Sequence, residues 1–308
     1  MCGIIGLHLK NPDLQPRLGE LLTQMLEAMT TRGPDSAGIA VYADPPGFGS
    51  TAAGPDGRPV LRYSLRSDGS LDWELLGKRL AAETASEVQV RQLGPDLAVL
   101  SSPADEALLL AAVAQAAPQV SVTGRGQAMV LVKDVGAPAD ICARYGIPGW
   151  AGYQGVGHTR MATESAVTTA HSHPFAPAAD LALVHNGSFS NYATVRRRLA
   201  RAGVTCDTDN DSEVAARLIA TRMAAGDGLE DAIKTVFKEM DGFFTLLVTT
   251  RTQFAVVRDS FACKPAVIAE TSDYVAMASE YHALAGLPGI TGAEVFEPMP
   301  EEIHLWSR

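Results

Sequence analysis

The amino-acid sequence predicts an α+β fold in which antiparallel sheets are stacked and helices cover them from outside. The first observation is the last third of the chain, where apolar runs separated by turn residues indicate two hairpins, at 243–249 with 254–258 and at 265–269 with 274–278. The second is a strand, helix, strand order within the first 42 residues. Strands in hairpins that are flanked by amphipathic helices are typical of such layered proteins.

The opening segment supplies the first three elements. An apolar run beginning at Ile4 and Ile5 predicts a strand. After a turn at 11–13, apolar residues recur at the spacing of one helix face: Leu18, Leu21, Leu22, Met25, Leu26 and Met29. Gly33 and Pro34 end this helix, and residues 36–42 return as a strand.

Residues 43–150 differ from both flanks and predict an insertion or small subdomain. Gly- and Pro-rich loops open it, and it contains helix candidates at 73–85 and 105–116 and strand candidates at 97–101 and 129–133. It shows no catalytic constellation. We therefore expect it to serve partner contact or support, within one domain that spans 1–308.

Motifs become dense again after residue 155. A strand runs into a loop at 155–164, and the apolar strand 181–184 ends in His185-Asn186-Gly187. As an isolated dipeptide, Asn-Gly after a strand predicts a tight turn. Helices are expected at 191–202, from 211 onward, along the apolar face 229–240, and briefly at 279–284.

Cys2 carries the first chemical hypothesis. If Met1 is removed, a thiol and a free α-amine share one carbon, and their ordinary pKa values of about 8.5 and about 8 let the amine accept the thiol proton near neutral pH. Gly3 would leave room for a substrate beside the sulfur. The alternative is that Cys2 is an ordinary small residue at a frayed terminus.

Composition narrows the partners. A formal net charge of -10 argues against nucleic acid or an anionic membrane surface, which both reward clustered Lys and Arg. No apolar run approaches a membrane span and no signal peptide is evident, so we expect a cytoplasmic protein. Four isolated cysteines indicate neither a disulfide framework nor a zinc site.

Taken together, the motifs resemble those of class II glutamine amidotransferases, the N-terminal-nucleophile branch of amide hydrolases. The resemblance covers 2–42 and 155–284 and lies in five pieces in family order: Cys2-Gly3-Ile4-Ile5-Gly6, Arg32-Gly33-Pro34-Asp35-Ser36-Ala37-Gly38, Gly157-His158-Thr159-Arg160, His185-Asn186-Gly187 and Asp211-Ser212-Glu213. It implies a four-layer αββα sandwich of antiparallel sheets with an inserted subdomain.

The resemblance also assigns roles for a glutamine substrate. Cys2 is the nucleophile, and Asn186 and Gly187 form the oxyanion hole. Arg160 has the planar fork that suits the α-carboxylate, and Asp211 pairs with the α-ammonium. The family further places three residues near the pocket: Arg32, Asp35 and Thr163.

Plainer interpretations exist for single residues. An arginine near a strand end is usually a surface ion pair, and an aspartate at a helix start is usually an N-cap. His171 and His173 lack a third ligand at metal spacing, so we interpret them as structural and expect no metal site. We interpret His158 as a packing residue.

The resemblance implies a stand-alone glutaminase subunit that passes ammonia to a separate synthase subunit. The partner would be similar to glutamate synthase or N-methylglutamate synthase, and FMN and an iron–sulfur cluster would belong to the partner subunits, with no cofactor in this chain. Two alternatives stay open. One is a self-contained γ-glutamyl amide hydrolase, and the other is a non-catalytic glutamine-binding subunit.

Overall fold

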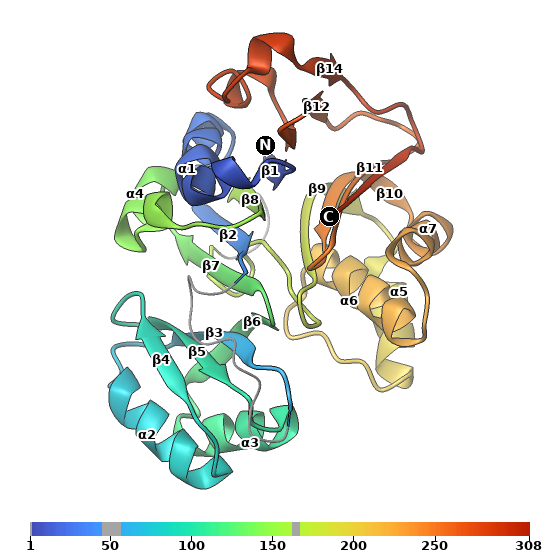
Figure 1. Cartoon of the computed structure of the whole chain (residues 1–308). Helices are drawn as coiled ribbons and strands as arrows, with labels where there is room; N and C mark the ends of the chain where they lie inside the picture. Colours follow the sequence, from blue (N-terminus) through green and yellow to red (C-terminus); the bar gives the residue numbers. More distant parts are fainter. Residues whose placement is uncertain (1, 45–56, 162–166) are drawn as a thin grey trace.

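The computed structural model describes residues 2–44, 57–161 and 167–308. These residues form two stacked antiparallel sheets between two layers of helices, and a third sheet with its own helices stands beside them (Figure 1). The order of the layers is the αββα sandwich of the prediction, which is confirmed.

The larger sheet has seven strands, in the order β14-β12-β13-β1-β8-β2-β7. Its strands are β1 (Gly3–Leu9), β2 (Ser36–Tyr42), β7 (Met129–Val135), β8 (Gln154–Arg160), β12 (Val267–Glu270), β13 (Tyr274–Ala278) and β14 (Glu294–Phe296). Each neighbouring pair is antiparallel. The first strand of the chain therefore lies in the interior of this sheet, between β13 and β8.

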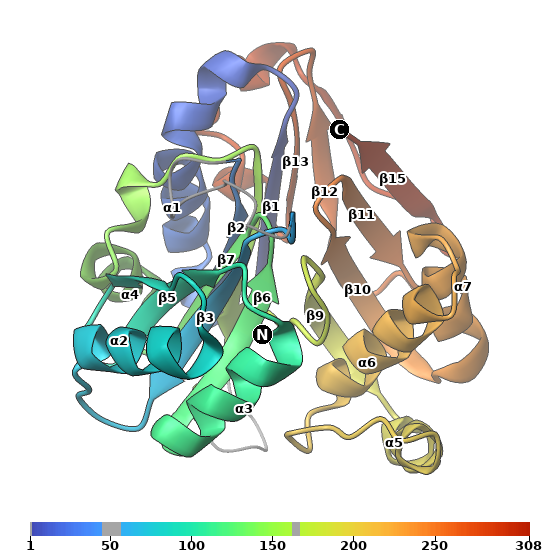
Figure 2. The ribbon, with the colours of Figure 1, turned by 60° about the horizontal axis from the view of Figure 1, so that its bottom comes forward.

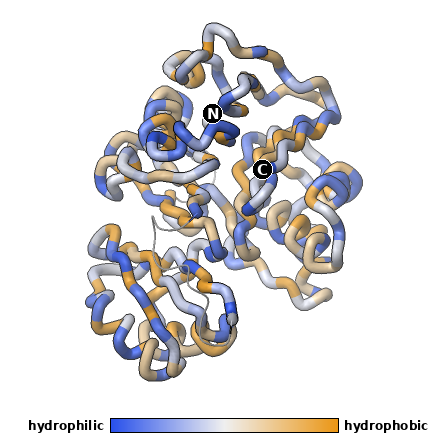
Figure 3. Tube along the Cα trace, in the orientation of Figure 1, coloured by the Kyte–Doolittle hydropathy of each residue, from blue (hydrophilic) through white to orange (hydrophobic). Residues whose placement is uncertain are grey.

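The facing sheet has four antiparallel strands, in the order β15-β11-β10-β9. They are β9 (Ala182–Phe189), β10 (Gly242–Thr249), β11 (Gln253–Arg258) and β15 (Ile303–Ser307). One apolar cluster, with Ile4, Val184 and Leu247 among its fully buried members, joins the two sheets. In Figure 3, hydrophobic colouring follows the strands of this sandwich. The prediction of two hairpins, β10–β11 and β12–β13, is confirmed.

Helices cover both outer faces, as Figure 2 shows from a second side. Helices α1 (Leu18–Ala28) and α4 (Pro138–Arg144) pack on the seven-stranded sheet, and α5 (Tyr192–Arg201), α6 (Asp211–Ala224) and α7 (Leu229–Glu239) pack on the four-stranded sheet. The apolar stripe that predicted α1 is buried almost completely. No helix within the described ranges is long and apolar enough to cross a membrane.

Within the ranges that the structure describes, five short 3-10 helices complete the main layers: Pro12–Arg17, Thr30–Arg32, Ile147–Gly149, Tyr281–Ala283 and Ile290–Gly292. The helix expected at 279–284 is therefore a single 3-10 turn. The isolated-dipeptide prediction of a turn at Asn186-Gly187 is wrong. Strand β9 continues through both residues to Phe189, because β10 pairs with it over its whole length.

The third sheet, in the order β4-β5-β3-β6, belongs to the predicted insertion. It contains β3 (Leu61–Ser67), β4 (Gln89–Gln92), β5 (Leu97–Ser102) and β6 (Val120–Gly126), with α2 (Trp73–Thr84) and α3 (Glu106–Ala116) packed on it around a core of its own. Strand β7 and helix α4 lie within the predicted range 43–150 but belong to the main layers. The separate sheet thus occupies a narrower segment, 61–126.

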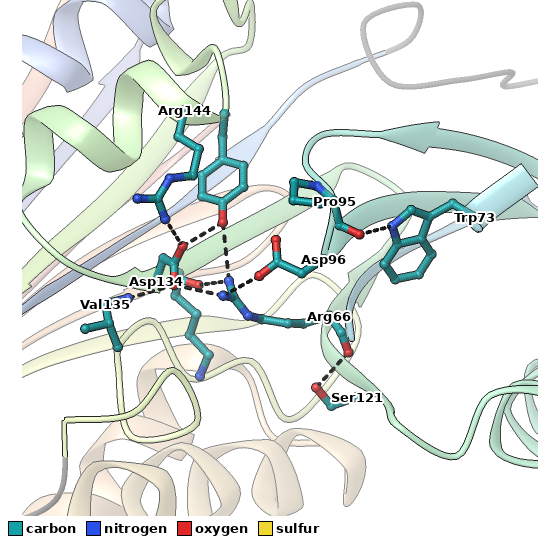
Figure 4. A network of polar contacts seen from close by, with 10 residues as sticks. Arg66, Trp73, Pro95, Asp96, Ser121, Asp134, Val135 and Arg144 are labelled. Atoms are coloured by element: carbon teal, nitrogen blue, oxygen red, sulfur yellow. Dashed lines mark hydrogen bonds and ion pairs between the residues drawn. The ribbon is translucent and has the colours of Figure 1, made fainter. Parts of the chain in front are cut away.

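An ionic network ties this small sheet to the main one (Figure 4). Arg66 of β3 donates to Asp96 and to Asp134 of β7, both at 2.8 Å. Asp134 also accepts from Arg144 and from the Tyr145 hydroxyl, each at 2.7 Å. These contacts lower the pKa of Asp134 against the effect of burial, so the carboxylate stays charged at the junction.

Candidate active site

The backbone around Cys2 is fixed by its neighbours on both sides. Ile4 donates its N–H to the Ser279 hydroxyl at 2.9 Å and accepts from the Ser279 N–H at 2.9 Å, while Gly3 pairs with Thr159 of β8. A Cβ at Gly3 would lie 2.7 Å from the Thr159 hydroxyl and 2.9 Å from the Met29 Cβ. Gly3 therefore permits close packing of β1, and the expectation that it also leaves room for a substrate stays a prediction.

Two side chains bind the carbonyl oxygen of Cys2. The Arg32 Nε donates to it at 2.9 Å and the Asn186 Nδ2 at 3.2 Å. Arg32 is itself held by Glu280, whose carboxylate lies 2.5 Å from Nη1. The hydrogen bond from Arg32 lowers the pKa of Glu280. This arrangement orients the residue that carries the thiol.

The half-exposed Cys2 opens into a cavity of about 580 Å³, which we call the Cys2 cavity. Its lining comes from the ends of β8 and β9, the start of α6 and neighbouring loops: Cys2, Arg160, Met161, His173, His185, Gly187, Ser188, Phe189, Tyr192, Asp209, Asn210, Asp211, Ser212 and Phe243. A volume of this size is typical of small-molecule sites. Segments far apart in the sequence therefore meet at the thiol.

Four of the eight predicted site residues line this cavity, namely Cys2, Arg160, Gly187 and Asp211. Asn186 and Arg32 lie behind it, on the Cys2 carbonyl. Asp35 also lies outside the lining, where its backbone N–H donates to the Arg160 carbonyl at 3.1 Å. Thr163 falls outside the described residues. The chemical roles predicted for these residues are taken up under Proposed function.

Arg160 is the last residue of β8 and is only 6% exposed. It pairs with Ser36 of β2, so the 32–35 loop lies directly against the end of its strand. Arg160 is therefore not on the exposed surface, which is the part of the ion-pair interpretation that burial excludes. A buried guanidinium at a cavity wall can bind a carboxylate where water does not weaken the contact.

Asp211 is held with its carboxylate in place at the start of α6. One oxygen accepts from the Phe189 N–H at 2.8 Å and the other from the Ser212 hydroxyl at 3.2 Å. The N-cap of α6 is Asn210, whose side chain accepts from the Ser212 N–H at 2.9 Å. The simple N-cap interpretation of Asp211 is thus wrong.

Only glycine fits at position 187. Its φ of +150° is rare for other residues, and a Cβ there would lie 2.0 Å from the Phe243 carbonyl oxygen and 2.9 Å from the His185 Nε2. The constraint comes from β10, which approaches β9 closely at this point. The result is a backbone segment without a side chain beside the cavity.

Three buried histidines surround the cavity, and the sequence analysis missed two of them as site residues. His173 and His185 line it, and His158 stacks on His173 with ring centroids 4.1 Å apart. Burial lowers the pKa of all three, that of His158 to about 3, so the rings are neutral at pH 7. The sequence shows these histidines, but it does not show that their rings are buried beside a cavity.

The hydrogen bonds indicate one tautomer for His185. The Ser212 hydroxyl donates to Asp211, so His185 Nδ1, 2.7 Å away, donates to Ser212. Its Nε2 then carries a free lone pair and has no protein partner within the described part of the chain. His171 bonds Asp209 at 2.7 Å instead. Among the described residues, no group of three or more His, Cys, Asp or Glu is arranged to hold a metal ion.

The fold and the site together define an amide hydrolase of the N-terminal-nucleophile type. A cysteine at the start of a central strand faces a cavity that offers a cation at one wall and a carboxylate at another. A family model described as a glutamine amidotransferase domain matches residues 158–286.

Full-length relatives place the chain within this class. It is 44% identical to the "Glutamine amidotransferase-like protein GlxB" of Rhizobium meliloti (strain 1021), over 99% of this chain and 98% of the relative. It is 31% identical to a "Putative glutamine amidotransferase" of Methanothermobacter thermautotrophicus, over 99% of both. The chain belongs to the class II glutamine amidotransferase family, as its motifs predicted.

A solved structure supports the fold. The glutamine phosphoribosylpyrophosphate amidotransferase of B. subtilis superposes with a TM-score of 0.61 at 18% identity. The match covers all of this chain and 49% of that one, so this chain spans about half of its length. At such low identity the likeness shows the shared fold alone.

Proposed function

We propose that this protein is an ammonia-donating glutaminase subunit, which hydrolyses L-glutamine to glutamate and ammonia through a thioester at Cys2. The observation that supports it is the meeting of Cys2, Arg160 and Asp211 at one cavity of suitable size. These three groups match the three polar parts of glutamine.

Binding uses the two charged walls. The Arg160 guanidinium takes the α-carboxylate with two parallel hydrogen bonds. The Asp211 carboxylate takes the α-ammonium with the lone pairs that Phe189 and Ser212 leave unused. With the head group held in this way, the side-chain amide extends toward Cys2, and the neutral histidines add no competing charge.

The chemistry proceeds in two steps. With Met1 removed, the α-amine of Cys2 accepts the thiol proton and the thiolate attacks the amide carbon. The Gly187 N–H and the second Asn186 N–H stabilise the oxyanion, since the first already binds the Cys2 carbonyl. The α-amine then passes this proton to the amide nitrogen, which leaves as ammonia. Water then attacks the γ-glutamyl thioester, which frees glutamate and regenerates the thiol.

The ammonia passes to a separate synthase subunit. The motif resemblance supports a partner similar to glutamate synthase or N-methylglutamate synthase, in which FMN and an iron–sulfur cluster would carry the redox chemistry. Nothing in the glutaminase step requires a cofactor in this chain, because thiol, amine and hydrogen-bond donors are sufficient.

The test is chemical labelling with matched cysteine variants. The purified protein should release ammonia from glutamine, and a glutamine-mimicking electrophile such as 6-diazo-5-oxo-norleucine should add to Cys2, as located by peptide mass spectrometry. Cys2→Ala should abolish both. Cys263→Ala, which removes an exposed free thiol, should leave both unchanged. Glutamine hydrolysis that survives Cys2→Ala would exclude the proposal.

A further inference from the structure

A second cavity, of about 450 Å³, lies where the small third sheet meets the main layers. We call it the Lys133 cavity. Its lining comes from β3, β6, β7, the 168–177 loop and the start of α6: Arg66, Asp68, Ser121, Val122, Thr123, Lys133, Val135, Thr168, Thr169, Ala170, Phe175, Ala176, Pro177, Asp207, Thr208, Glu213 and Arg217. Of the residues that the structure describes, none is common to its lining and that of the Cys2 cavity.

Lys133 is the notable member of this lining. It is 6% exposed, and its Nζ donates to the carbonyls of Ser172 and Ala170, at 2.9 and 3.4 Å. The same Nζ lies 4.9 Å from the centroid of the Phe175 ring, another wall of the cavity. Burial lowers the pKa of Lys133 to about 8, although the Glu213 and Asp207 carboxylates of the same lining act in the opposite direction from beyond ion-pair distance, so the ammonium still predominates at pH 7.

The other buried charges at the cavity already have partners. Arg66 pairs with Asp96 and Asp134, as Figure 4 shows. Arg217 pairs with Asp207 at 2.6 Å and with Glu213 at 3.1 Å. Within the described ranges, no carboxylate lies within ion-pair distance of Lys133. A buried ammonium bound only by carbonyls is costly, and an anion beside it would offset the cost.

The other lining residues indicate which kind of anion would fit beside Lys133. Val122, Val135, Phe175, Ala176 and Pro177 present hydrocarbon, the lining serines and threonines present hydroxyl groups, and Asp68 is an exposed carboxylate of the lining. The apolar members favour a carbon body, and the lining carboxylates disfavour a multiply charged anion such as a nucleotide. A single carboxylate on a short apolar body therefore matches both the charge and the walls.

We propose that the Lys133 cavity is a second binding site, which takes a small organic monocarboxylate whose carboxylate binds the Lys133 ammonium. The site is close to the first, because the segments 168–177 and 207–213 contribute residues to both linings. The inserted subdomain contributes the remaining wall of the Lys133 cavity, through β3 and β6. This gives the subdomain a role in ligand binding, and the proposal does not depend on glutamine hydrolysis.

The experiment is a titration of the whole protein with 4-fluorobenzoate, followed by ¹⁹F NMR. Wild type should show saturable binding, while the uncharged 4-fluorobenzamide should bind at least tenfold more weakly. Lys133→Met should weaken 4-fluorobenzoate about tenfold or more, because a charged hydrogen bond is lost. Lys238→Met, which removes an exposed lysine of α7, should leave binding unchanged.

A second variant guards against a folding defect in Lys133→Met. Val122 is 36% exposed on β6, so Val122→Asp should fold normally while adding a repelling carboxylate to the cavity wall, and it should weaken binding about fivefold. Circular dichroism checks each fold. Cys2→Ala should bind normally, which separates this proposal from the proposed function. No saturable binding by wild type, or equal binding by folded Lys133→Met, would overturn it.

Discussion

The two cavities use the same two stretches of chain but differ in how charge is treated. Around the Cys2 cavity, Arg160 and Asp211 offer opposite charges and the buried histidines are neutral. Around the Lys133 cavity, one buried ammonium forms no ion pair among the described residues, and the lining carboxylates Asp207 and Glu213 are paired with Arg217 instead. The first arrangement suits a zwitterionic amino acid, and the second suits a simple anion. The motifs predict residues of the first cavity, where we propose the chemistry, whereas the second depends on a subdomain that carries no motif.

The largest expected effect is a loss of glutamine hydrolysis without a loss of binding in the Lys133 cavity. Asn186→Ala removes a side chain that binds the Cys2 carbonyl and, in the proposed mechanism, the oxyanion. We expect kcat for glutamine hydrolysis to fall about 10²–10³-fold, the usual loss for one oxyanion donor. Binding of 4-fluorobenzoate should be unchanged. Steady-state ammonia release measures the first quantity.

A control distinguishes lost catalysis from a misplaced nucleophile. In Asn186→Ala, iodoacetamide should still alkylate Cys2 at close to the wild-type rate, because Arg32 continues to hold the Cys2 carbonyl. A kcat within threefold of wild type would contradict the role of Asn186.

The second prediction concerns the neutral histidines. The folded pKa of His158 is about 3, against an ordinary value of 6.5. Between these pH values the unfolded chain binds a proton that the folded chain does not, so the free energy of unfolding decreases as the pH falls below 6.5. The expected slope for this residue is about 1.4 kcal/mol per pH unit.

Urea unfolding at pH 7.5, 6 and 5 measures this slope. His158→Gln keeps a donor for the His185 carbonyl and should reduce the acid sensitivity, whereas the exposed His282→Gln should not. If the free energy of unfolding changed with pH equally in wild type and His158→Gln, His158 would not be held neutral.

A smaller effect tests the role proposed for Arg160. Arg160→Lys retains the positive charge but loses the planar fork, so the two parallel hydrogen bonds to the α-carboxylate in the proposed mechanism become one. We expect KM for glutamine to rise about tenfold, the size of one charged hydrogen bond, with a smaller change in kcat. A variant with unchanged KM would place the carboxylate elsewhere in the Cys2 cavity.

The sequence predicted the order of the layers and several residues of the Cys2 cavity, but it did not predict how distant segments pair and pack. Cys2, Arg160, Gly187 and Asp211 follow from motifs, because a reaction requires particular residue types in order. The continuation of β9 through Asn186-Gly187 was not predictable locally, since pairing with β10 overrides the turn preference of that dipeptide. The 43–150 segment likewise divides between two sheets, which only long-range pairing decides.

Lys133 illustrates the remaining limit. Its position at the end of a predicted strand is compatible with an ordinary exposed lysine, and nothing in the sequence shows that it is buried. Its burial arises because the 168–177 loop covers β7 and presents two carbonyls to it. The burial of His173 and His185 was likewise not predictable from the sequence. Motifs and hydrophobic periodicity do not show which side chains distant segments will bury.

The last prediction uses this burial to test the Lys133 cavity without a ligand. The folded pKa of Lys133 is about 8, against an ordinary value of 10.5. Between those pH values the unfolded chain holds a proton that the folded chain has lost, so the buried charge penalises folding fully below pH 8 and progressively less above it. Lys133 should therefore make wild-type stability rise with pH across this window.

Urea unfolding of wild type, Lys133→Met and Lys238→Met at pH 7.5, 8.5 and 9.5 isolates that contribution. Other groups titrate in the same range, but they are common to all three proteins, so the difference between variants is informative. Relative to Lys133→Met, wild type should gain about 2 kcal/mol over these two pH units, whereas Lys238→Met should follow wild type throughout. A constant difference between wild type and Lys133→Met would mean that the ammonium is not buried as a charge, and the electrostatic contrast between the two cavities would then be lost.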